Sequence, residues 1–109
     1  MTTTLLDRAR AEEYAAWFRA LADASRVQIL EYLARQARPM TVGELVDVVG
    51  LAQSTVSQHL RILLEVRFVL MEPVGTSRRY RVNDRCVGSF PTAADVVMGR
   101  PAPVVECAG

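Results

Sequence analysis

The chain has 109 residues, half of them hydrophobic, and a formal net charge of +1. This size fits one domain with a single core and favours an oligomer. No uncharged apolar run approaches the roughly eighteen residues that a bilayer crossing needs, and the N-terminus lacks a signal-peptide stretch, so we expect a cytoplasmic protein without membrane association. The two cysteines, Cys86 and Cys107, are too few for a disulfide framework and are not spaced as in a zinc finger.

The positive charge is concentrated in the middle third of the chain. Residues 1–50 carry six arginines against seven acidic residues, residues 51–85 six against three, and residues 86–109 one against two. A basic region of net charge +3 favours contact with a phosphate backbone, although an excess of this size is also ordinary on a protein surface.

Two helices are predicted in the first third of the chain. The first covers residues 5–22, where aromatic and aliphatic side chains recur at helical spacing and the charges lie on the other side. The second is capped by Asp23 or Ser25 and ends before the Arg38-Pro39 pair, because the residue before a proline disfavours helix.

The next two predicted helices have the lengths of a helix-turn-helix. Thr41, followed three residues later by Glu44, is a capping-box signature for a short helix through Val49. Gly50 then supplies a turn, and a helix follows over residues 53–65.

The fourth helix is the most informative part of the sequence. Within LAQSTVSQHLRILL (residues 51–64), the apolar Val56, Leu60 and Leu63 share one stripe of a helix. The opposite face carries hydrogen-bonding side chains, namely those of Gln53, Ser54, Thr55, Ser57, Gln58 and Arg61. Such side chains can bind base edges and phosphates in a major groove, so this helix is predicted to read DNA.

A β-hairpin is predicted after the helix-turn-helix. Residues 68–74 and 78–82 have strand character and are joined by a turn at Gly75. A two-stranded hairpin in this position is a wing, and its second strand carries Arg78 and Arg79. We expect these arginines to lie along the phosphate backbone or to reach a minor groove.

The last segment is predicted to be interrupted. A helix can start at Asp84, but Pro91 opposes its continuation, and a separate short helix is expected over 92–99. The expected division is therefore a winged helix-turn-helix domain with an N-terminal dimerisation helix over 1–90, and a short C-terminal helix with a Pro-rich tail over 91–109.

The segments FRALADASRVQIL, TVGELVDVVGLAQSTVSQHLRIL and VGTSRRYRV resemble the ArsR/SmtB winged-helix repressors of bacteria. The resemblance covers roughly residues 14–84. It implies a mainly α winged helix-turn-helix (α+β), with about five helices and a two-stranded β-wing. It also implies a homodimer that binds an inverted repeat of double-stranded operator DNA and represses transcription.

The resemblance also assigns roles to single residues. The expected base contacts come from Gln53, Ser54, Ser57 and Gln58. Thr55 and Arg61 are expected on phosphates, and Arg78 and Arg79 at the wing tip. Residues 40–42 would bring the N-terminus of the third helix close to the DNA backbone.

The metal sites of this family are incomplete in the sequence. Arsenic and lead sensors carry cysteines in the third helix, but residues 44–48 contain none. Zinc and cobalt sensors use two pairs of ligands in the last helix, and Asp84 and Cys86 align with the first pair. Val97 and Arg100 occupy the second pair and cannot bind a divalent cation. Asp84 is equally explained as a helix cap, and Cys86 as a small hydrophobic residue.

Two alternatives for regulation stay open. Cys86 and Cys107 of a dimer could bind a transition metal or a trivalent metalloid, or close as a redox disulfide, which would make a thiol-based sensor. Alternatively, the winged helix is a protein-interaction module, and a regulatory partner protein does the sensing. An enzyme is not expected, because there is no phosphate-binding loop and no histidine lies near either cysteine in sequence. The single histidine, His59, is expected to form structural hydrogen bonds rather than to bind a ligand.

Overall fold

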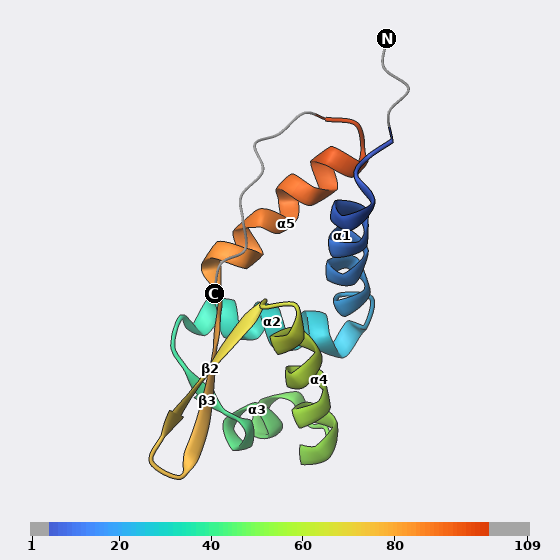
Figure 1. The fold of residues 1–109 in the computed structure, drawn as a ribbon. Helices are drawn as coiled ribbons and strands as arrows, with labels where there is room; N and C mark the ends of the chain where they lie inside the picture. The colour runs from blue at the N-terminus through green and yellow to red at the C-terminus, as the bar shows by residue number, and fades with distance from the viewer. Residues whose placement is uncertain (1–4, 101–109) are drawn as a thin grey trace.

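The computed structural model describes residues 5–100 of the chain, with the backbone alone at 86–89 (Figure 1). In chain order the elements are α1 (Arg8–Ala20), α2 (Ala24–Gln36), β1 (Met40–Thr41), α3 (Val42–Val49), α4 (Gln53–Glu65), β2 (Val69–Val74), β3 (Ser77–Val82) and α5 (Asp84–Val97). The predicted helix-turn-helix and the hairpin that follows it are therefore confirmed. No helix within residues 5–100 combines the length and the apolar character that a membrane crossing requires.

Local side-chain chemistry sets the starts of the helices. Asp23, rather than Ser25, caps α2, because its carboxylate accepts the backbone N–H of Arg26 at 3.1 Å. The predicted capping box of α3 is complete, since Thr41 and Glu44 each accept the backbone N–H of the other. The capping box thus places the start of α3 at the residue where the sequence predicts it.

The sheet has three strands in the order β1-β3-β2, where the sequence predicts a wing of two. Both pairings are antiparallel, and β1 adds its two residues by pairing Met40 with Tyr80 and Thr41 with Arg79. A two-residue strand has no alternation that a sequence pattern could show, and its pairing depends on residues almost forty positions away. β1 ties the base of the wing to the start of α3.

The core lies where α1, α2 and α4 meet the base of the sheet. A row of aromatic rings runs through it from Tyr14 over Trp17 and Phe68 to Phe90, with ring centroids 5.5–6.2 Å apart. Phe90 also meets Phe18 edge-on at 5.3 Å. These contacts fix α5 against α1, and the two helices lie together at one end of the molecule (Figure 1).

The expected interruption of the last helix at Pro91 is wrong. Helix α5 runs without a break from Asp84 to Val97 with Pro91 inside it, so Thr92 starts no separate helix. An interior proline removes one backbone hydrogen bond and costs about 3 kcal/mol. Packing offsets this cost, because Ala93 is fully buried and Phe90 makes edge-to-face contacts with two core rings. The boundary expected between residues 90 and 91 therefore falls within a continuous helix.

Candidate nucleic-acid interface

Helix α4 has one buried face and one exposed face. Val56, Leu60 and Leu63 are fully buried and dock the helix on the core. The side chains predicted to read DNA lie on the rest of its surface, with Gln53, Ser54, Thr55, Gln58 and Arg61 exposed and Ser57 half-buried. The amphipathic pattern is confirmed, and the contact of these side chains with DNA stays a prediction.

The two polar groups in the middle of this face are already linked. Arg61 donates a hydrogen bond from Nη1 to the side-chain oxygen of Gln58, at 3.3 Å, one helical turn apart. This contact restricts both side chains on the outer surface of α4 and lowers the entropy that a ligand must remove to order them.

The N-terminus of α4 has no side-chain cap. Its N-cap residue is Ala52, which has no side-chain oxygen to offer the first-turn amides. The positive end of the helix macrodipole is thus placed beside Gln53 and Ser54, where an approaching phosphate would be stabilised.

The N-terminus of α3 differs from the expectation for residues 40–42. Met40 is buried, and the carboxylate of Glu44 covers the start of the helix by accepting the Thr41 N–H at 3.0 Å. Arg38 donates to the same carboxylate at 3.0 Å. Hydrogen bonds from the Thr41 N–H and Arg38 lower the pKa of Glu44, which keeps this carboxylate charged. The negative charge disfavours a phosphate here, so the electrostatics favour α4 over α3 as the helix end nearest the backbone.

The two wing arginines have different surroundings. Arg78 is exposed near the hairpin turn and pairs with Pro73 across the strands. Arg79 lies between Glu72 on one neighbouring strand and Thr41 on the other, and is half-buried. Its Nε is buried and has no hydrogen-bond partner among the described residues. Successive side chains of a strand point to opposite faces, so Arg78 and Arg79 lie on opposite faces of the wing.

His59 forms structural contacts, as expected from the sequence. Its Nδ1 lies 3.3 Å from Nη1 of Arg26, and its side chain is only 13% exposed. The carboxylate of Asp23 lies 4.0 Å from Nε2 of the same ring. His59 therefore turns away from the exposed face of α4 and toward the junction of α1 and α2.

A metal site is not assembled by the described side chains. No group of three or more His, Cys, Asp or Glu residues lies close enough to hold an ion, within the part of the chain whose side chains are described. Asp84 is exposed and lines a small hollow together with Arg38 and Arg81, whose charges disfavour a cation. The side chain of Cys86 and the whole of Cys107 lie outside the described residues.

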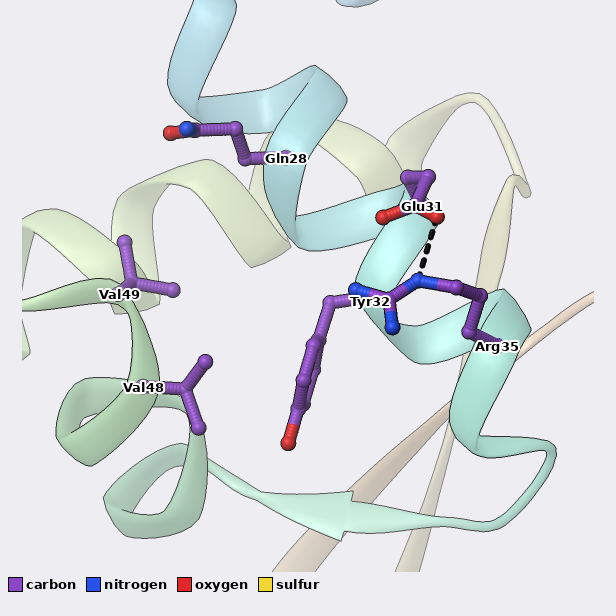
Figure 2. A pocket seen from close by; sticks show the side chains of 6 residues that line it. All are labelled: Gln28, Glu31, Tyr32, Arg35, Val48 and Val49. Carbon is purple, nitrogen blue, oxygen red and sulfur yellow. Dashed lines mark hydrogen bonds and ion pairs between the residues drawn. The ribbon is translucent and has the colours of Figure 1, made fainter.

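A separate open groove of about 230 Å³ lies between α2 and α3 (Figure 2). It is lined by Gln28, Glu31, Tyr32, Arg35, Val48 and Val49. Arg35 donates to Glu31 and lies over the ring of Tyr32, 5.5 Å from its centroid. The opposite charges of this groove are thus paired with each other, and we place the candidate interface on α4 and the wing.

Comparison with known proteins shows the family of the chain. The family model described as bacterial regulatory protein, arsR family, matches residues 23–70. The HTH-type transcriptional regulator Rv2034 of Mycobacterium tuberculosis is 39% identical over 80 residues, which cover 73% of this chain and 72% of that protein. The chain belongs to the ArsR family. The matched segment of this ArsR-family chain runs from the cap of α2 to the first residues of β2 and so contains the whole helix-turn-helix.

Two further similarities cover more of this ArsR-family chain than the family model does. A probable mercury resistance operon repressor of Streptomyces lividans is 38% identical over 77% of this chain, which spans only 61% of that protein. A solved homodimeric winged helix-turn-helix DNA-binding domain from Mycobacterium bovis, described as a possible ArsR-family regulator, has a TM-score of 0.69 at 25% identity. That alignment covers 93% of this chain and 94% of the other, so the likeness in fold includes α1 and α5.

Proposed function

We propose that this ArsR-family protein is a homodimeric transcriptional regulator that binds an inverted repeat of operator DNA and acts as a repressor. The observation that carries this proposal is the division of α4 into a fully buried stripe and an exposed face of short hydrogen-bonding side chains. A recognition helix needs both, because the stripe holds the helix rigidly and the exposed face reads the groove.

The proposed contacts divide into two kinds. Gln53, Ser54, Ser57 and Gln58 bind base edges in the major groove and give sequence preference. The other contacts go to phosphates, from Thr55, Arg61, Arg78 and Arg79. Phosphate contacts fix the position of the protein and supply affinity that depends on salt, but carry no sequence information directly.

The proposed dimer forms through α1 and α5. Leu5 and Leu6 precede α1 and are 88% and 43% exposed, while Val97 and Met98 at the end of α5 are 49% and 77% exposed. Burying such side chains against a second copy contributes about 25 cal/mol per Å², or several kcal/mol in total. The similar M. bovis domain is described as homodimeric, which supports a dimer. A two-fold axis then places two α4 helices about 34 Å apart, which is one turn of DNA.

The experiment that tests this function is selection of binding sites from a randomised duplex pool. We expect enrichment of an inverted repeat whose half-site centres are about ten base pairs apart. A variant carrying Gln53→Ala and Ser57→Ala serves as the matched control, because it keeps every buried residue of α4 and every arginine. It should bind DNA with little enrichment of any sequence. Failure of the unmodified protein to enrich any site over the starting pool would contradict the proposal.

A further inference from the structure

The side chain of Arg26 connects three helices. Its Nε donates to the carbonyl oxygen of Ala20 at 2.6 Å, and its Nη2 donates to that of Arg19 at 3.4 Å, both at the C-terminal end of α1. Its Nη1 lies 3.3 Å from Nδ1 of His59 in the middle of α4. Arg26 itself belongs to α2, and its side chain is only 14% exposed. One guanidinium group therefore links the proposed dimerisation helix to the proposed reading helix.

The charge of this guanidinium is balanced locally. Asp23 has one carboxylate oxygen 3.9 Å from Nη1 of Arg26 and the other 4.0 Å from Nε2 of His59. Arginine has no acceptor, so in this contact Nδ1 of His59 accepts and the neutral ring carries its proton on Nε2, toward Asp23. The Asp23 carboxylate thus lies within 4.0 Å of both the Arg26 guanidinium and the His59 ring.

The contact between Arg26 and His59 adds a directional constraint to the packing of α4. The buried Val56, Leu60 and Leu63 hold α4 on the core through apolar contacts, which are not directional in themselves. A hydrogen bond is directional and weakens steeply when bent. The same helix carries the exposed side chains that we propose bind DNA, so a rotation of α4 at His59 would also move them.

We propose that Arg26 is a positioning residue, which fixes the orientation of α4 relative to α1 through His59. The inference rests on the proposed function, because it concerns how the reading helix is presented to DNA. In a dimer built on α1 and α5 the contact occurs twice and sets both reading helices relative to the interface. Base contacts require this orientation of the two α4 helices, whereas non-specific attraction to phosphates does not.

The test compares operator DNA with scrambled duplex of equal length, both measured by fluorescence anisotropy. Arg26→Met keeps the length of the side chain and removes all donors, and His59→Leu removes the acceptor. We expect each to weaken operator binding about tenfold, the loss typical of a hydrogen bond to a charged group, with little change on scrambled DNA. The double variant should also lose about tenfold rather than a hundredfold, since each change removes the same contact between Arg26 and His59.

Conservative variants separate positioning from charge and folding. His59→Asn places a side-chain oxygen near the position of Nδ1 and should keep operator affinity within about threefold of the original. Arg26→Lys keeps the charge but cannot reach the α1 carbonyls and His59 together, so it should lose as much as Arg26→Met. Arg35→Met, an exposed arginine of the same helix paired with Glu31, should change nothing.

An independent readout examines the contact itself. In the free protein, the ¹⁵N resonances of the His59 ring should show an unprotonated Nδ1, and Arg26→Met should shift them. A protonated Nδ1, additive losses in the double variant, or equal losses on both DNAs would each overturn the proposal. If the unmodified protein shows no operator preference, the proposed function fails and the inference with it. If the preference is present but insensitive to both residues, only the inference fails.

Discussion

Replacement of Arg78 on the wing gives a quantitative test of the DNA interface. Arg78 is exposed beside the hairpin turn, and no acidic group pairs with it within the described part of the chain, so its charge is available to a phosphate. A dimer presents two copies. Each phosphate contact contributes about 0.9 to the slope of log affinity against log salt, so Arg78→Ala should reduce that slope by about 1.8.

The corresponding effect on affinity is large enough to measure directly. Between about 50 and 200 mM salt, the unmodified protein should lose about twelvefold more affinity than Arg78→Ala. The assay is a salt titration of operator binding by fluorescence anisotropy, repeated on scrambled DNA, where the same change in slope is expected. Arg78→Lys, which keeps the charge, should restore the slope.

The controls distinguish phosphate contacts from base contacts. Gln53→Ala should reduce the preference for operator over scrambled DNA and leave the slope unchanged, because it removes no charge. Arg35→Ala removes an arginine of α2 that is paired with Glu31, and it should change neither the salt slope nor the preference for operator DNA. A salt slope for Arg78→Ala equal to that of the unmodified protein would refute the wing contact and the reasoning from exposure that supports it.

Three further predictions concern stability and regulation. Leu60→Ala, at a fully buried position of α4, should lower the free energy of unfolding by about 2–5 kcal/mol in urea titrations. Ile62→Ala, at a half-buried position of the same helix, should lower it clearly less. Equal losses in the two variants would contradict the assignment of Leu60 to the core. The pKa values of Asp23 and Glu44 are lowered, chiefly by hydrogen bonds from the backbone N–H groups of Arg26 and Thr41. The two carboxylates therefore stabilise the fold fully above their ordinary pKa values of 3.8 and 4.5, and this stabilisation is lost as the pH falls through their lowered pKa values. Asp23→Asn with Glu44→Gln, which keep both caps, should flatten acid unfolding followed by circular dichroism, and an unchanged acid transition would contradict this assignment. Operator affinity should be indifferent to Zn(II) and Co(II), and release that depends on Cys86 would instead establish a thiol-based sensor.

Much of the candidate site was predictable because its determinants are local. The capping box of Thr41 and Glu44 and the stripe of α4 lie within a few residues of sequence, and both are present in the structure. Helix periodicity and caps depend on neighbours three or four positions apart, so a linear pattern contains them. The same periodicity separates the exposed side chains of α4 from those that pack.

Other features depended on contacts between residues far apart in the chain. The pairing of Met40 with Tyr80 adds a strand too short to leave any pattern. Burial of Ala93 and the aromatic contacts of Phe90 stabilise α5 as a continuous helix across Pro91, although a proline locally disfavours helix.

Local sequence patterns predict the helix-turn-helix, the wing and the exposed polar face of α4. Contacts between distant segments account for the continuity of α5, for the half-buried position of Arg79 between two strands, and for the contact of Arg26 with His59 across 33 positions. The physical reason is that local propensities amount to a few kcal/mol at most for each element, whereas packing and directional hydrogen bonds between distant segments exist only once the chain is folded.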